Sequence, residues 1–162
     1  MPHGVMLRDA TADDLPALTD ALIEAVNWHG RDPLDEAGVM SQPQLAHYVA
    51  GWPRPGDFGT IAVVGAAAVG AAWCRTFSAD DAGYGYVADD VPEVSIGVAA
   101  AWRGRGVGTT LLAELIRQAR ARGLRALSLS VEDGNHARRL YERAGFTVVG
   151  REGGSDVMRL LI

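Results

Sequence analysis

The stretch Arg103-Gly104-Arg105-Gly106-Val107-Gly108 combines residue types that suit the binding of an anion. It follows an alternating apolar segment, Val94 to Val98, and precedes a helical apolar pattern, so it is expected to join a strand to a helix. No Ser, Asp or Asn stands at this helix start to cap the first N–H groups, which have no partner within the helix. Glycines let an anion approach closely, and the helix dipole and two arginines add positive charge. The stretch therefore predicts a phosphate or pyrophosphate site.

The spacing of this turn argues against two common phosphate-binding motifs. A P-loop needs a lysine after its second glycine, and the chain contains no lysine. The dinucleotide-binding fingerprint needs a third glycine where Thr109 stands, and it would follow the first strand. Arg103-x-x-Gly106-x-Gly108 instead resembles the Arg/Gln-x-x-Gly-x-Gly/Ala turn of the GNAT superfamily, the Gcn5-related N-acetyltransferases. The resemblance implies that the phosphate ligand is the pyrophosphate of acetyl-CoA.

A second block, from Asn135 to Phe146, resembles the same superfamily. It is similar to the pattern Asn-x-x-Ala-x-x-x-Tyr-x-x-x-Gly-Phe, shortened by one or two residues before Tyr141. The two blocks cover residues 93–150, which the resemblance identifies as the acetyl-CoA-binding core of a single N-acetyltransferase domain spanning residues 1–162. Residues 1–92 agree with the family only in general layout, so they are expected to form the acceptor side, and the acceptor itself is not carried over.

The resemblance also implies which residues hold the cofactor. In the family, the strand before the glycine turn pairs with the pantetheine arm, and the turn holds the pyrophosphate. The cofactor-binding residues expected on this basis are Ile96, Gly97, Val98, Arg103, Gly104, Arg105, Gly106, Val107, Gly108, Thr109 and Asn135. No metal is expected.

The implied chemistry is acyl transfer from a thioester to a primary amine, which needs a base and an acid. An amine like that of lysine is protonated near neutral pH and must lose a proton before it attacks. Glu93 is the candidate base because it begins the cofactor strand, where partial burial would raise its pKa. Tyr141 matches the family tyrosine that protonates the departing thiolate. Their alternative roles are a strand-end carboxylate and a buried aromatic residue.

Four residues between the first two helical segments are candidates for the acceptor pocket, as the resemblance implies for this region. They are Trp28, His29, Tyr48 and Trp52. Each could instead be a core or capping residue, and at least one is expected in the pocket. Family members that acetylate ribosomal-protein N-termini usually carry a glutamate where this chain has Ser130, so that specific acceptor loses support. Small amines and protein N-termini both remain possible acceptors.

The order of predicted elements indicates an α/β (α+β) fold. Helices are expected from Leu15 to Trp28, from Pro43 to Ala50, after Gly106 and after Asn135, and strands at 5–8, 60–64, 66–77, 93–98, 126–131, 146–149 and 157–161. This order predicts a mixed, mostly antiparallel sheet of about six to seven strands with helices on both faces. The resemblance adds a splay at the cofactor strand. Residues 78–90 read as a long loop that could close over the acceptor.

Composition and charge distribution limit which partners and which cellular location are expected. Residues 1–100 hold 4 Arg against 14 acidic residues, and residues 101–162 hold 11 Arg against 6. This asymmetry suits an anionic cofactor and a cationic acceptor, although drifting surface charge explains it equally well. No basic stripe, membrane-length apolar run or signal peptide is evident, so neither nucleic acid nor a membrane is expected as a partner and a cytoplasmic location is the default. A homodimer is left open.

Two other functions fit the same turn. A protein of this fold could bind an acyl-CoA without turning it over, as a sensor or regulatory module. A nucleotide-binding regulator could place an adenine nucleotide there. The presence of both Glu93 and Tyr141 favours the enzyme, because a sensor needs only the turn.

Overall fold

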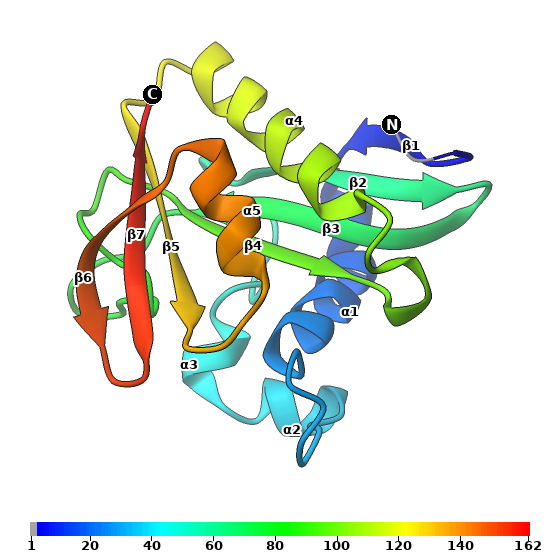
Figure 1. Cartoon of the computed structure of the whole chain (residues 1–162), viewed down its shortest axis with the longest axis horizontal. Coiled ribbons are helices and arrows are strands. Elements are labelled where there is room, and N and C mark those ends of the chain that lie inside the picture. The colour runs from blue at the N-terminus through cyan, green and yellow to red at the C-terminus, as the bar shows by residue number, and fades with distance from the viewer. Residues whose placement is uncertain (1–2) are drawn as a thin grey trace.

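The computed structural model describes residues 3–162 as an open seven-stranded sheet with helices on both faces (Figure 1). The strands are β1 (Met6–Asp9), β2 (Phe58–Val64), β3 (Ala67–Arg75), β4 (Glu93–Val98), β5 (Ala126–Glu132), β6 (Thr147–Glu152) and β7 (Ser155–Leu161). The helices are α1 (Leu15–Val26), α2 (Glu36–Met40), α3 (Pro43–Ala46), α4 (Val107–Ala121) and α5 (Ala137–Ala144), with short 3-10 helices at Ala12–Asp14 and Ala100–Trp102. The predicted fold class is confirmed.

The sheet order is β1-β2-β3-β4-β5-β7-β6, and β4–β5 is the parallel pair among antiparallel neighbours. Their ladder consists of one residue pair, Glu93 with Ser128. Beyond it the two strands diverge, as the resemblance implied. The backbone of β4 past Glu93 therefore lacks a β5 partner on that side, and such polar groups call for another partner.

Two apolar layers hold the helices to the sheet, because side chains alternate between faces along a strand. Phe58, Ala72 and Cys74 pack with the apolar stripe of α4, while Ile61 and Trp73 pack with α1. Figure 1 shows α4 and α5 in front of the sheet and α1 behind it. The strands that carry the cleft are thus fixed from both sides.

The acceptor side differs from expectation in its helices. α1 ends at Val26, not at Trp28, and Asn27 then exchanges two side-chain hydrogen bonds with the backbone of Leu34. The short α2 was not predicted, although Asp35 caps it by accepting a hydrogen bond from Gly38 N. α3 is regular only over Pro43–Ala46 and continues as hydrogen-bonded turns. Within residues 3–162, none of the helices has the length and apolar character to cross a membrane.

Candidate active site

A cleft of about 1000 Å³ opens where β4 and β5 diverge. Its walls come from elements far apart in the sequence, namely the end of α1, the whole of β4, the start of α4, the end of β5, α5 and the β6–β7 hairpin. Glu93 and Tyr141 both line this cleft, together with Gly104 and Gly108 of the glycine turn. The splay therefore brings the predicted base, the predicted acid and the predicted anion site to one cavity.

The glycine turn has the backbone that its sequence suggested. Gly104 and Gly106 have φ values of +72° and +83°, in the left-handed region that other residues rarely adopt. Gly106 is the N-cap of α4, no side chain caps this end, and the first turn of the helix carries no acidic residue. The free N–H groups and the positive end of the helix dipole remain available to an anion, which fits a pyrophosphate.

The two arginines of the turn are already engaged. Arg103 donates to Glu24 Oε2 at 2.5 Å and to the carbonyl of Val98 at 3.2 Å, which ties the turn to α1 and β4. The guanidinium of Arg105 stacks over the Trp102 ring, 4.9 Å from its centroid. Arg103 lines the cleft, whereas Arg105 does not. Arg103 is thus paired with a carboxylate, whereas Arg105 keeps its positive charge beside the backbone N–H groups of the turn.

The remaining cofactor candidates divide into lining and supporting residues. Ile96, Gly97, Val98 and Asn135 line the cleft, while Gly106, Val107 and Thr109 do not. Val107, the first residue of α4, has its side chain buried in the core, so it can offer a ligand only its backbone. Asn135 Oδ1 accepts a hydrogen bond from Ala137 N at 2.9 Å and thereby caps the start of α5.

Glu93 is buried at the start of β4, with 4 % of its surface exposed. Its Oε2 accepts a hydrogen bond of 2.5 Å from the hydroxyl of Tyr48, and its Oε1 has no hydrogen-bond partner among the described residues. Burial raises the pKa of the Glu93 carboxyl to about 7, while the Tyr48 hydrogen bond and, to a smaller extent, the backbone N–H of Gly85 oppose that rise. A carboxyl with this pKa can accept and release a proton near neutral pH.

Tyr141 lies on α5, whereas Glu93 begins β4, and both residues line the cleft. Its ring packs edge-on against Phe146, with the centroids 6.1 Å apart. Burial raises the pKa of the Tyr141 phenol to about 12, so the hydroxyl keeps its proton at neutral pH. It can therefore donate a proton or a hydrogen bond to a group in the cleft.

The four acceptor candidates separate into two pairs. Trp28 and Tyr48 line the cleft. The structure places Trp52 in the core behind the sheet, where its indole N–H donates to the carbonyl of Thr11 at 2.9 Å. His29 is exposed, and its Nδ1 accepts a hydrogen bond from Arg31 N. Neither Trp52 nor His29 is among the lining residues.

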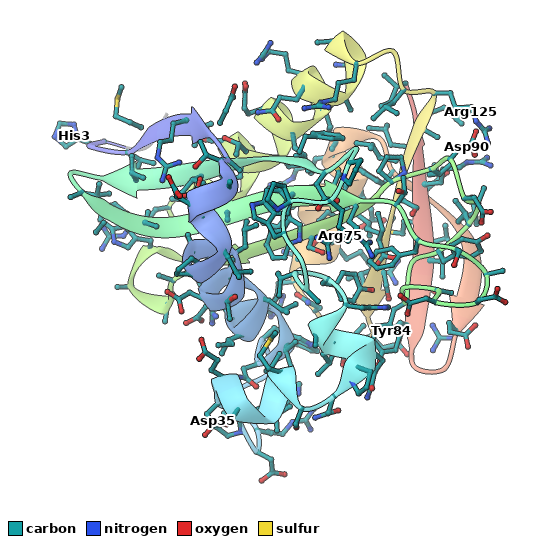
Figure 2. The ribbon with its side chains drawn as sticks, turned by 180° about the vertical axis from the view of Figure 1, so that it is seen from behind. His3, Asp35, Arg75, Tyr84, Asp90 and Arg125 are labelled. Atoms are coloured by element: carbon teal, nitrogen blue, oxygen red, sulfur yellow. The ribbon has the colours of Figure 1, made fainter. Side chains whose placement is uncertain are left out.

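Several lining residues were not identified from the sequence. They are Leu22, Leu45, Tyr84, Glu132 and the hairpin residues Glu152 to Ser155, among others. Tyr84 is the residue of the predicted loop 78–90 that reaches the cleft, in the region between α3 and the β6–β7 hairpin (Figure 2). The sequence pointed to Tyr84 only through its place in a long Asp-, Gly- and Ala-rich loop. No sequence feature pointed to the hairpin residues as part of the site.

Comparisons with known proteins agree with this geometry. The chain matches the Acetyltransferase (GNAT) family over residues 22–146. Over 63 residues it is 38% identical to the [Ribosomal protein bS18]-alanine N-acetyltransferase of Haemophilus influenzae, a match that covers 39% of this chain and 43% of that relative. The match thus spans less than half the length of that relative.

Solved structures extend the similarity to nearly the whole chain. A ribosomal-protein-alanine N-acetyltransferase from Brucella melitensis is 28% identical, with a TM-score of 0.69 over 97% of this chain and 99% of that one. The protein yncA from Salmonella typhimurium, solved with acetyl-CoA, is 26% identical, with a TM-score of 0.67 over 97% and 93%. The chain belongs to the Acetyltransferase (GNAT) family and is an acyltransferase.

Proposed function

We propose that this protein transfers an acetyl group from acetyl-CoA to a primary amine within a ternary complex. The observation that carries the proposal is the single cleft that joins the uncapped glycine turn, the buried carboxyl of Glu93 and the phenol of Tyr141. The similarity to yncA, solved with acetyl-CoA, supports the choice of acyl donor.

Acetyl-CoA would lie along the splayed strands, with its pyrophosphate at Gly104 to Gly108 and its pantetheine arm beside Ile96 to Val98. The unpaired backbone of β4 and the free N–H groups of α4 are the groups that would hold it. When bound, it supplies a thioester carbonyl carbon that an amine can attack. The residues of this chain then have three tasks, namely to orient the two substrates, to remove a proton from the amine and to protonate the sulfur.

Glu93 is proposed to take the proton from the ammonium group, directly or through a water molecule. The neutral nitrogen then forms the new N–C bond, the C–S bond breaks, and Tyr141 gives its proton to the departing thiolate. The second proton that the nitrogen loses as it becomes an amide restores the Tyr141 phenol, and Glu93 releases its proton to solvent. A pKa of about 7 for Glu93 suits the first task, and a pKa of about 12 for Tyr141 keeps it protonated for the last. Backbone N–H near Val98 is proposed to stabilise the negative charge that develops on the carbonyl oxygen.

The acceptor is proposed to enter from the side of α1, α3 and the β6–β7 hairpin, of which residues 1–92 supply α1 and α3. Glu132 and Glu152 both pair in register with Ser155, so three neighbouring strands place these side chains in one row at the edge of the cleft. Two carboxylates in such a row favour an amine that carries positive charge. Peptide N-termini and small amines are both consistent with this surface.

The test is a screen that follows thiol release from acetyl-CoA with diamines, amino acids and peptides that have free N-termini. We expect turnover with at least one cationic amine, and a loss of that turnover in Glu93→Gln that is largest at low pH and smaller where more of the amine is already neutral. Binding of acetyl-CoA with no thiol release for any amine would favour the sensor instead. Parallel pH profiles for Glu93→Gln and wild type would remove Glu93 as the base.

A further inference from the structure

The hydroxyl of Tyr48 makes two hydrogen bonds, one as acceptor and one as donor. It accepts a hydrogen bond of 2.8 Å from the backbone N–H of Tyr84 and donates its own proton to Glu93 Oε2 at 2.5 Å. Tyr48 is 6 % exposed, and burial raises the pKa of its phenol far above the usual range, with the charge of Glu93 adding to the effect. The phenol therefore remains protonated, and its one proton points at the carboxylate.

The backbone that carries Tyr48 is fixed from the sheet. The indole of Trp73 donates to the carbonyl of Tyr48 at 2.9 Å, and Arg75 Nη1 donates to the carbonyls of His47 and Ala50 at 2.9 and 2.7 Å. Arg75 is itself buried and paired with Asp57 at 2.7 Å. Figure 2 shows Arg75 in the interior of the molecule. The position of the phenol is thus set by β3, the strand next to β4.

The other face of the carboxyl group is fixed by the loop before β4. A Cβ added at Gly83 would lie 2.2 Å from Glu93 Oε1 and 2.9 Å from the Tyr48 hydroxyl. A Cβ at Gly85 would lie 2.5 Å from the backbone carbon of Leu129 on β5. The loop therefore has no room for a side chain at either glycine, and Gly83 lies against the buried Oε1, which has no hydrogen-bond partner within residues 3–162.

We infer that Tyr48 is a positioning residue, which acts through Glu93 to hold one carboxylate oxygen and leave the other as the proton acceptor. The inference rests on the proposed function and revises the expectation that Tyr48 contacts the acceptor. The ionisable groups around Glu93 include Tyr48 itself, the Arg75–Asp57 pair on the α1 side, Cys74 on β3 and Tyr84 of the loop before β4. They also include His47, which pairs with Asp81 and whose ring packs 4.7 Å from that of Tyr48. Of these, Tyr48 is the one hydrogen-bonded to the carboxyl group.

The test is Tyr48→Phe, which keeps the ring and the bond from Trp73 to the Tyr48 carbonyl but removes the donated proton, together with the acceptor for the Tyr84 N–H. Because a hydrogen bond to a charged group stabilises the charged form, the Glu93 titration midpoint should rise by about 1 to 2 pH units. Carbon-13 NMR of the Glu93 carboxyl in the free protein measures this shift without any substrate. Tyr86→Phe is the matched control, since it removes a hydroxyl bonded to Asp89 in the same loop and should leave the midpoint unchanged.

Kinetics separate positioning from acceptor binding. In Tyr48→Phe the acidic limb of the kcat/KM profile should move to higher pH with the NMR midpoint, and adding Tyr48→Phe to Glu93→Gln should cause no further loss in kcat. A further rise in KM in the double variant would show that Tyr48 binds the acceptor, and an unchanged NMR midpoint would overturn the inference outright. If wild type turns over no amine, the proposed function fails while the NMR result still decides whether Tyr48 controls Glu93.

Discussion

Gly97 of β4 lies directly against the carbonyl oxygen of Ala21 in α1. A Cβ added at Gly97 would stand 1.8 Å from that oxygen and 2.5 Å from the carbonyl carbon. This close approach seats α1 on β4 and brings its last turns, with Leu22 and Val26, to the cleft wall. The glycine thus serves the packing of two elements that shape the site.

Gly97→Ala should therefore destabilise the fold. Relief of the clash requires α1 and β4 to move apart, and forced overpacking costs about 1–3 kcal/mol or more. Chemical denaturation measures the loss in the free energy of unfolding. The control is Gly150→Ala in β6, where the added Cβ would meet Val157 at an ordinary 3.8 Å. Equal free energies of unfolding for the two variants would mean that α1 and β4 can move apart at Gly97 with little cost.

Arg75→Met should be among the most destabilising single changes. It leaves the buried carboxylate of Asp57 without its cationic partner and removes the donor to the carbonyls of His47 and Ala50, in the turns that follow α3. Breaking a buried ion pair costs about 3–5 kcal/mol. Thermal unfolding should show a fall of roughly 10 °C. The matched control is Arg125→Met, which breaks the exposed pair with Asp90 at 2.9 Å and should cost under about 1 kcal/mol. A similar small effect for both would contradict the assigned role of Arg75.

Gly106→Asp should abolish stabilisation by acetyl-CoA. The carboxylate would stand where the pyrophosphate is proposed to lie, at the positive end of α4. Wild type at a ligand concentration about 100 times Kd should gain about 2.7 kcal/mol, which melting experiments detect as a rise in Tm. Gly106→Asn is the control, because asparagine has the same size and tolerates positive φ but carries no charge. An undiminished Tm shift in Gly106→Asp would remove the anion site from this turn.

The burial of Glu93 makes a prediction about stability as a function of pH. Its folded pKa of about 7 exceeds the reference value of 4.5, so the folded protein binds the proton more tightly than the unfolded chain. The stability contributed by Glu93 is then fully present below about pH 4.5 and is lost as pH rises through about 7. Relative to wild type, Glu93→Gln should gain up to about 3 kcal/mol between pH 5 and pH 8.

Denaturation at several pH values checks this trend against a control of opposite sign. Arg117 lowers the pKa of Glu114 through a hydrogen bond, so the stability that Glu114 contributes is lost as pH falls instead. Glu114→Gln should therefore lose, not gain, stability relative to wild type as pH rises. If Glu93→Gln followed wild type at every pH, the carboxyl of Glu93 would have an ordinary pKa in the folded protein.

Tyr141→Phe separates an acid from a core aromatic residue. The variant keeps the ring and its contact with Phe146, so its Tm and its acetyl-CoA affinity should match those of wild type. Turnover should fall by about 100-fold, the low end for a positioned proton donor, because a thiolate can also leave unprotonated. A wild-type rate in an assay limited by the chemical step would show that the hydroxyl takes no part.

The sequence by itself determined the features that depend on neighbouring residues. The glycine turn could be predicted because positive φ needs glycine and because an uncapped helix start is visible in the residue order. The apolar stripe of α4, the ends of β4 and α5, and the fold class followed from periodicity and turn residues in the same way. The burial of Glu93 could be expected because it stands where an apolar strand begins.

Only the tertiary structure decided how the acceptor side is built. The sequence offered no reason to treat Trp28 and Trp52 differently. In the structure Trp28 lines the cleft and Trp52 fills the core, since their positions depend on packing against residues far away in the chain. The pairing of Tyr48 with Glu93 joins residues 45 positions apart and depends on Arg75 of a third segment. No local pattern encodes such a contact, because it arises from the register of β3 with β4 and from the burial that their packing creates.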